Sequence, residues 1–297
     1  MKPQIIFKTH ESHLDQSVNF EYTPSEGIGR FEARYVRRND DYFIVYLSSQ
    51  SGCIQACRMC HLTATRQTEY VDATLDDFLA QSGRVLEHYS AMHPAELVHF
   101  NFMARGEPLD NPLILSNSEL LLGSLANQAT DLGLKSKYLI STILPKSIGN
   151  ARIEDIFSTS NEALMPEIYY SIYSMNPEFR RRWLPKAHKA EHGLDLLKSW
   201  QVHSGKIPKI HFAFIEGQND SEQDMEAIAH AINARDLKVS LNIVRYNPPS
   251  PEHSKETEES KIYQLFDYLR DLIKPEKSKV VSRVGLDVKA SCGTFLS

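Results

Sequence analysis

Three cysteines lie within a short stretch of this chain and constrain what the segment can do. Cys53, Cys57 and Cys60 have the spacing Cys-x3-Cys-x2-Cys, and the only other cysteine in the sequence is Cys292. Thiolates are soft ligands that suit iron–sulfur clusters or zinc. A four-iron cluster held by three cysteines would leave one iron free to bind a small molecule. The alternative is a structural zinc site, which needs four ligands and would take His61 or Cys292 as the fourth.

The composition limits the class of protein. With 297 residues, 41% of them hydrophobic, the chain can form one large domain, or one domain with a small appendage. No apolar run approaches the ~20 residues that span a membrane, and the N-terminus has no secretory signal pattern. Four cysteines, three of them clustered, fit a reducing compartment better than a disulfide framework. We therefore expect a soluble, cytoplasmic protein that is a monomer.

The formal net charge of −5 argues against a globally basic nucleic-acid-binding protein. A local basic patch remains compatible with it, because attraction to phosphate acts within about 10 Å at ordinary salt. Two groups of basic residues are candidates for RNA contact, and a solvated helix face is the alternative for each. The first group is Arg34, Arg37 and Arg38, and the second is Arg180, Arg181, Arg182, Lys186 and Lys189, with Trp183 among them.

Apolar residues alternate along the chain between strand-like and helix-like periods. The predicted strands are residues 31–36, 42–46, 97–102, 138–141, 168–172, 210–215, 239–244 and 279–282. The predicted helices begin at Thr74 and Ser221 or cover residues 120–126, 194–197 and 262–273. Thr74 has an acid three residues later, which is a capping-box pattern.

This alternation predicts the α/β class, because strand–helix–strand units wind around a parallel sheet. Residues 1–46 form a predicted N-terminal β-rich extension, with a hairpin that turns at residues 38–41. Residues 47–297 form a predicted partial (β/α)6 barrel. Active sites of such barrels lie at the carboxyl ends of the strands. The cysteine motif follows the first strand of the barrel and so falls at that end.

Polar residues also follow the later strands of the predicted barrel. A carboxylate at Glu107 could accept hydrogen bonds from an ammonium group, and Gly106 would allow close approach. Other strands end at Ser141, at Ser171 and Tyr173, and at Asn247. Each of these residues alone is typical of a cap or a turn.

The cysteine motif resembles the signature of the radical S-adenosylmethionine (SAM) enzymes, in which a 4Fe–4S cluster cleaves S-adenosyl-L-methionine reductively. Residues 48–52 before it (Ser-Ser-Gln-Ser-Gly) resemble the approach to the cluster in the RlmN/Cfr family of RNA adenine methyltransferases. The resemblance runs from about Glu32 to the C-terminus. It implies that Cys53, Cys57 and Cys60 are the metal ligands.

The resemblance also implies a set of residues that bind SAM. Gly106 and Glu107 would bind its amino group, and the remaining contacts would come from Ser141, Ser171, Tyr173 and Asn247. Two positions depart from the family pattern: Ala104 replaces a glycine, and Tyr173 replaces a histidine. The loop at residues 215–220 resembles the family's loop that ends in Asn-Asp.

Cys292 lies in a second stretch that resembles the family. Residues 287–293 read Asp-Val-Lys-Ala-Ser-Cys-Gly, similar to the family's closing Asp-Ile-x-Ala-Ala-Cys-Gly. The resemblance implies that Cys292 accepts a methyl group from one SAM molecule. A second SAM would then yield a radical that takes a hydrogen from the S-methyl group, whose carbon adds to the adenine ring. The alternative for Cys292 is a buried, inert thiol.

The remaining family features match less fully. The family has a further cysteine seven residues before the first cluster cysteine, where this chain has Tyr46. In the family this second cysteine helps to break the thioether link that forms between the base and the methyl-carrying cysteine. Here Tyr46 or another residue could assist that step differently, or an external thiol could break the link. The substrate could also be something other than RNA adenine. Glu32 resembles the family's proposed general base, although by itself it is an ordinary strand-edge acid. Cys53 comes too early for the family's N-terminal accessory domain.

These features favour a methyltransferase that moves a methyl group through Cys292 to an adenine ring carbon of RNA or of a nucleotide-like substrate. Its expected electron donor is a flavodoxin or a ferredoxin. One alternative is a radical SAM enzyme of the same architecture with a different substrate or outcome. Another is a zinc-stabilised RNA-binding protein without catalysis.

Overall fold

The computed structural model describes residues 5–250 and 252–296. Its ten strands form one sheet, and each strand pairs with its neighbours in chain order. The strands are β1 (Lys8–Glu11), β2 (Val18–Tyr22), β3 (Phe31–Arg37), β4 (Tyr42–Tyr46), β5 (Leu97–Phe102), β6 (Lys135–Thr142), β7 (Glu167–Tyr170), β8 (Lys209–Ala213), β9 (Ser240–Val244) and β10 (Ser278–Val281).

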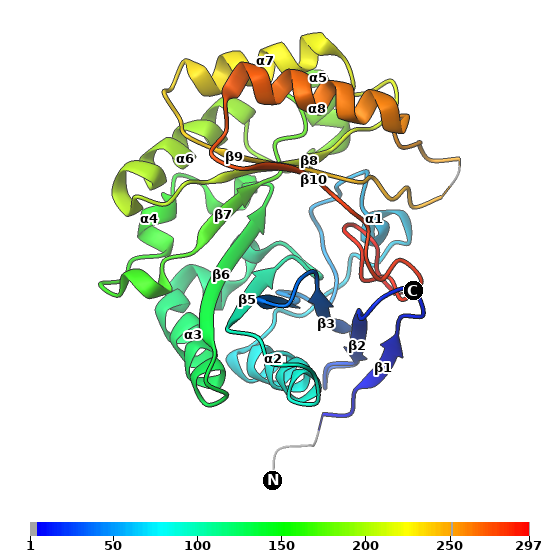
Figure 1. Cartoon of the computed structure of the whole chain (residues 1–297), viewed down its shortest axis with the longest axis vertical. Coiled ribbons are helices and arrows are strands. Elements are labelled where there is room, and N and C mark those ends of the chain that lie inside the picture. Colours follow the sequence, from blue (N-terminus) through cyan, green and yellow to red (C-terminus); the bar gives the residue numbers. More distant parts are fainter. Residues whose placement is uncertain (1–4, 251, 297) are drawn as a thin grey trace.

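The sheet changes from antiparallel to parallel at β4. The pairs β1–β2, β2–β3 and β3–β4 are antiparallel, and every later pair, from β4–β5 to β9–β10, is parallel. Figure 1 shows the sheet curving, with the long helices on its outer side. The predicted α/β class and partial barrel are therefore confirmed.

The helices connect successive parallel strands. They are α1 (His61–Ala64), α2 (Leu75–Tyr89), α3 (Pro112–Thr130), α4 (Ile153–Ile156), α5 (Pro177–Trp183), α6 (Ala190–Ser204), α7 (Glu222–Asn233) and α8 (Glu259–Ile273), with short 3-10 turns at Pro108–Asp110, Lys146–Ile148 and Glu162–Leu164. The helix starts predicted at Thr74 and Ser221 are confirmed, because each hydroxyl forms a capping box with the acid three residues later. A core of apolar side chains lies between these helices and the sheet.

The N-terminal strands extend the barrel sheet. The patterns of apolar residues did not predict β1 and β2, although all five residues of β2 are buried. β2 lies between β1 and β3, and Phe20 and Tyr22 join the main core. β4 closes the N-terminal antiparallel part and is also the first strand of the parallel part. The domain boundary at residue 46 stays a prediction.

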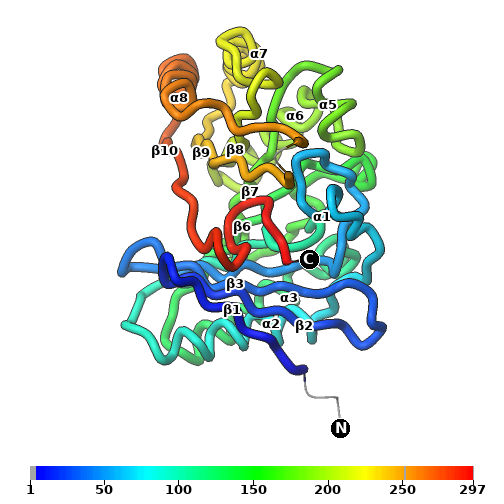
Figure 2. Tube along the Cα trace, turned by 90° about the vertical axis from the view of Figure 1, so that its right-hand side faces the viewer, coloured from blue at the N-terminus to red at the C-terminus, as the bar shows by residue number. Residues whose placement is uncertain are grey.

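Residues 282–296, which we call the C-terminal segment, connect the two ends of the sheet. Figure 2 shows the segment running from β10 back towards β1 and β3. Asp287 accepts hydrogen bonds from Ser12 Oγ at 2.7 Å and from the His13 amide at 2.8 Å. Asn19 Nδ2 donates to the Val288 carbonyl at 3.1 Å. The segment therefore covers the open side of the barrel.

The helices in the described part of the chain are all too short or too polar to cross a lipid bilayer.

Candidate active site

The three clustered cysteines lie on the loop between β4 and α1. Hydrogen bonds tie this loop to the chain that follows α1, with the Cys53 amide donating to the Gln67 carbonyl at 3.1 Å. Gly52 makes the close approach possible, because a Cβ at this position would lie 2.3 Å from the Glu69 carbonyl oxygen. Glycine is therefore required where the loop meets its neighbour.

The three thiols face one cavity at the carboxyl ends of the parallel strands, which we call the site cavity. It spans about 1000 Å³, part of it open to solvent, and its walls contain Cys53, Cys57, Cys60, Gly106, Glu107, Ser141, Ser171, Tyr173, Asn247 and Cys292. The structure thus brings the three predicted metal ligands, the six predicted SAM-binding residues and the predicted methyl carrier to one place. Their individual roles stay predictions.

The donor set fits an iron–sulfur cluster. Burial raises the pKa of the Cys53 thiol, and the charge of Cys60 raises it further. Burial and the two other cysteines likewise raise the pKa of Cys57. Three such thiols can all ionise only beside a positive charge, which the iron atoms of a cluster would supply. Within residues 5–250 and 252–296, no group of three or more His, Cys, Asp or Glu side chains is already arranged to hold a metal ion.

Glu107 is held by the backbone around it. Its Oε1 accepts a hydrogen bond from the Leu109 amide at 3.2 Å, and its Oε2 accepts one from the Ile143 amide at 3.1 Å. Burial raises the pKa of this carboxyl to about 7 despite these bonds. Gly106 has a φ of 92°, which suits a residue without a Cβ. An amino group in the cavity would be a favourable partner for the carboxylate, because it would restore a counter-charge.

Asn247 connects the end of β9 to the C-terminal segment. Its Nδ2 donates to the Cys292 carbonyl at 2.9 Å, and its Oδ1 accepts from Arg283 Nε at 2.8 Å. The predicted SAM ligand therefore also fixes the backbone that carries the predicted methyl carrier.

Two residues that the sequence patterns did not single out surround the thiol of Cys292. Its Sγ lies 3.5 Å from Met103 Sδ and 3.9 Å from His211 Nε2. Burial lowers the pKa of His211 to about 3, helped by Lys209, so the ring is neutral near pH 7. Side chains alternate between the two faces of a strand. This alternation along β8 could have indicated that His211 points into the barrel, because its neighbours in the strand point away from the barrel interior.

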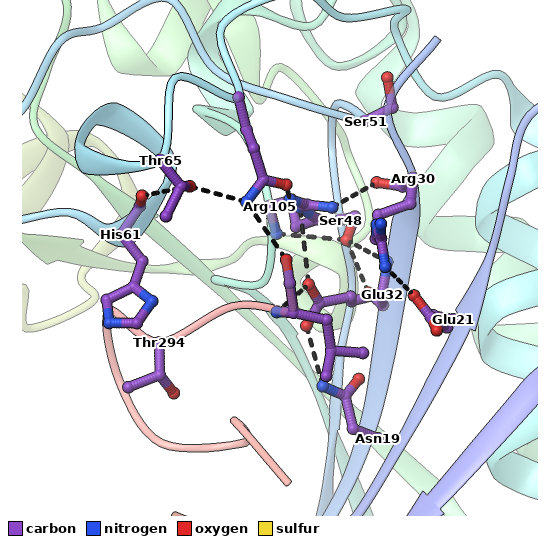
Figure 3. A network of polar contacts seen from close by, with 12 residues as sticks. Asn19, Glu21, Arg30, Glu32, Ser48, Ser51, His61, Thr65, Arg105 and Thr294 are labelled. Carbon is purple, nitrogen blue, oxygen red and sulfur yellow. Dashed lines mark hydrogen bonds and ion pairs between the residues drawn. The ribbon is translucent and has the colours of Figure 1, made fainter. Parts of the chain in front are cut away.

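Glu32 lies outside the walls of the site cavity as far as the described residues define them. Its Oε2 accepts hydrogen bonds from Asn19 Nδ2 at 2.9 Å and from an Arg34 guanidinium nitrogen at 3.0 Å. Its Oε1 accepts from the Leu296 amide at 3.0 Å and forms an ion pair with Arg105 at 3.6 Å. Figure 3 shows Glu32 gathered with Asn19 and Arg105 in one polar network.

Tyr46 lies near Cys292 but lines a different cavity, inside the barrel. Burial raises the pKa of its hydroxyl, and the charge of Cys292 contributes to this rise. The phenol is therefore neutral at ordinary pH and can act as a hydrogen-bond donor.

The two predicted basic patches are partly wrong. Arg34, Arg180 and Trp183 are buried, and the two arginines donate to backbone carbonyls inside the protein. Alternating burial along a strand or helix turns some members of each cluster inward. The exposed members of the second group are Arg181, Arg182, Lys186 and Lys189.

Comparisons with known proteins agree with this geometry. No family model matches the chain. It is 25% identical, over 97% of its length, to the dual-specificity RNA methyltransferase RlmN of Wolinella succinogenes, of which it covers 75%. It is 24% identical, over 83% of its length, to a probable RNA methyltransferase of Pseudomonas paraeruginosa, of which it covers 65%.

The structure is similar to the crystal structure of a radical SAM methyltransferase from Sphaerobacter thermophilus. The TM-score is 0.79 at 16% identity, and the match covers 98% of this chain and 80% of that one. This likeness establishes the fold. This chain therefore has the fold of a radical SAM methyltransferase, and its sequence is similar to that of the RNA methyltransferase RlmN.

Proposed function

We propose that this chain transfers a methyl group through Cys292 to an adenine ring carbon of RNA or of a nucleotide-like substrate. One observation carries the proposal: Cys292 shares the site cavity with Cys53, Cys57 and Cys60, although it lies near the other end of the chain. The relatives named RNA methyltransferases support RNA as the substrate class.

The cavity residues have distinct parts in this proposal. Cys53, Cys57 and Cys60 hold the cluster, and Glu107 accepts hydrogen bonds from the amino group of SAM. When bound, the cluster supplies the electron that cleaves SAM, and SAM supplies both the methyl group and the radical. Ser141, Ser171 and Tyr173 line the wall around SAM.

Cys292 must lose a proton when its sulfur accepts a methyl group. Burial raises the pKa of this thiol, so it is protonated at neutral pH. The neutral ring of His211 can accept a hydrogen bond from the thiol through Nε2, which lies 3.9 Å from Sγ. His211 and Met103 therefore orient Sγ, and Asn247 fixes the backbone of Cys292.

Glu32 and Tyr46 have less direct parts. The contacts of Glu32 with Arg34 and with the Leu296 amide favour a positioning role, because they hold the C-terminal segment that carries Cys292. Tyr46 and Cys292 both line the cavity inside the barrel. It occupies the sequence position of the family's second cysteine, so an external thiol would resolve the adduct.

A second candidate is a radical SAM enzyme of the same architecture with another outcome. Tyr46 favours it, because the four cysteines of the chain leave no second thiol to pair with Cys292. In either case we expect a flavodoxin or a ferredoxin to supply the electron.

Mass spectrometry of the Cys292 peptide tests the proposal. The protein would be reconstituted anaerobically with iron and sulfide and then incubated with SAM. We expect one methyl group on Cys292, and methylated adenine in RNA after a reductant and RNA are added. The matched control is Cys292→Ala, which should still cleave SAM reductively. Methylation of RNA that survives in this variant would exclude Cys292 as the carrier.

A further inference from the structure

A second cavity lies inside the barrel, and we call it the barrel cavity. It spans about 1010 Å³, part of it open to solvent, between the strands β3 to β10 and the C-terminal segment. Met103, His211 and Cys292 belong to the walls of both cavities. The barrel cavity also reaches Tyr42 and Lys209, at the amino ends of β4 and β8. A ligand there would approach Cys292 from the side opposite the cysteine motif.

The charge of the barrel cavity is strongly positive. Among the described residues in its wall, seven are lysine or arginine and none is aspartate or glutamate. The whole chain, in contrast, has a formal net charge of −5. Carboxylates that do not line the cavity neutralise four of the seven cations. Arg34 pairs with Glu32, Lys137 with Glu167, and Arg245 and Arg283 with Glu256.

The other three cations are Arg38, Lys209 and Lys279, and none of them forms an ion pair within 4.0 Å of a carboxylate in residues 5–250 and 252–296, although Glu167 acts on Lys209 from a longer distance. Arg38 donates to the Ser282 carbonyl at 3.1 Å, and Lys209 Nζ donates to the Tyr169 hydroxyl at 2.6 Å. These bonds satisfy hydrogen-bond donors but supply no counter-charge.

The three cations affect one another. Burial lowers the pKa of Lys209 to about 8; the charge of Glu167 opposes this change, and the charges of Lys137 and Lys279 add to it. Burial also lowers the pKa of Lys279, and Arg38 adds to this effect. Like charges brought together in a partly buried site are unfavourable. An anion among these three groups would relieve that repulsion.

The same cavity offers flat and polar surfaces to a ring. Tyr42 and His99 stack with their ring centroids 4.3 Å apart and their planes 17° from parallel. His211 is buried, and its Nδ1 has no hydrogen-bond partner in the described part of the protein. An aromatic base with hydrogen-bonding edges could therefore contact His211 beside Cys292, whereas Tyr42 lies with Lys209 at the amino ends of the strands.

We propose that the barrel cavity binds a single phosphorylated nucleotide, with its phosphate among Arg38, Lys209 and Lys279 and its base towards Cys292. Lys137 keeps 40% of its side chain exposed, so this end of the cavity is open to solvent. The inference rests on the proposed function only for the identity of the base, adenine.

Isothermal titration calorimetry with adenosine monophosphate and with adenosine tests the inference. The reconstituted protein would be saturated with S-adenosylhomocysteine, so that the site cavity is occupied. We expect one site that binds the monophosphate at least roughly tenfold more tightly than adenosine, because a phosphate gains charge-assisted hydrogen bonds. Raising the salt concentration should weaken the binding of the monophosphate and leave the binding of adenosine nearly unchanged.

Three variants locate the phosphate. Lys209→Gln and Lys279→Gln should each lower the affinity for the monophosphate roughly tenfold and leave the affinity for adenosine unchanged. Lys238→Gln is the matched control, since Lys238 is exposed and lies outside the cavity wall. Equal affinity for monophosphate and adenosine, or unchanged binding in both lysine variants, would overturn the inference. If a variant does not fold, the comparison of the two ligands and the salt dependence of the unaltered protein still decide it.

Two further comparisons are informative. One separates a free nucleotide from a nucleotide within RNA, and the other separates the cavity inference from the proposed function. A short adenosine-containing oligoribonucleotide distinguishes a nucleotide within RNA from a free one, and dependence on Lys209 for either ligand supports the inference. Methylated Cys292 without phosphate-dependent binding would overturn only the cavity inference. Lysine-dependent binding with an unmethylated Cys292 would overturn only the proposed function.

Discussion

Glu107 illustrates how the structure prepares a single side chain for a ligand. Its carboxylate accepts two backbone hydrogen bonds, and burial nevertheless raises its pKa to about 7. The position after β5 is visible in the sequence, but the burial that changes its chemistry comes from the surrounding strands and loops.

Binding of SAM should therefore depend on pH through Glu107. Below its pKa of about 7 the carboxyl is protonated and accepts hydrogen bonds from the amino group of SAM only weakly. We expect the affinity for SAM to fall roughly tenfold from pH 8 to pH 6, as the ionised fraction falls. Equilibrium dialysis with labelled SAM measures the affinity at each pH. Glu107→Gln should bind weakly at both pH values, and an unchanged pH dependence in this variant would contradict the assignment.

Gly106 is a second residue whose role follows from its surroundings. A Cβ there would lie 2.6 Å from Ser49 Oγ and 2.7 Å from the Gln50 amide nitrogen. We expect Gly106→Ala to lower the free energy of unfolding by about 1–3 kcal/mol and to weaken SAM binding. Urea unfolding and dialysis measure the two effects.

Gly217→Ala is the matched control for Gly106→Ala. Gly217 also has a positive φ, of 66°, but a Cβ there would meet nothing within 4 Å. This variant should show backbone strain alone and keep its affinity for SAM. Equal effects of the two substitutions on SAM binding would exclude a close-approach role for Gly106.

The loop between β4 and α1 is the element on which the cluster depends. The spacing of its cysteines already predicts a metal centre, because three soft ligands lie within eight residues, 53 to 60. The sequence does not show how the loop is held. The bond from the Cys53 amide to Gln67 and the close approach at Gly52 are tertiary contacts.

Removal of one loop thiol should remove the cluster. We expect Cys57→Ala to lose most of its iron and acid-labile sulfide after anaerobic reconstitution, since the ligand set would be incomplete. Cys292→Ala should keep both, because Cys292 is outside the ligand set. Colorimetric iron and sulfide analysis measures the difference. Full iron content in Cys57→Ala would contradict the assigned ligands.

The architecture of the whole molecule depends on the C-terminal segment. It joins β10 to the antiparallel strands and carries Cys292 into the site cavity. Arg34 is central to this closure, since it donates to the Ser291 and Thr294 carbonyls at 3.3 and 2.7 Å and pairs with Glu32.

Arg34→Lys should loosen this closure. A lysine keeps the charge but cannot reproduce the fork of guanidinium donors. We expect faster hydrogen exchange in residues 282–296 and a loss of Cys292 methylation of roughly tenfold or more, with SAM binding retained. Mass spectrometry measures exchange and methylation together. Arg37→Lys is the control, because Arg37 contacts carbonyls at the surface. Normal methylation in Arg34→Lys would contradict the positioning role of the segment.

The sequence by itself determined the class of fold and the location of the site. Alternating periods of apolar residues predict the parallel strands and helices, and polar residues after the strands share one edge because parallel strands point the same way. The cysteine spacing and the stretch around Cys292 predict the chemistry.

The tertiary structure decided what the local pattern cannot encode. The addition of β1 and β2 to the sheet depends on pairing with β3. The inward position of Arg34 and Arg180 depends on which face of each element is covered. The closure by residues 282–296 and the cations of the barrel cavity arise from contacts between distant segments. Long-range packing sets burial and charge environment, and these fix what each side chain can do.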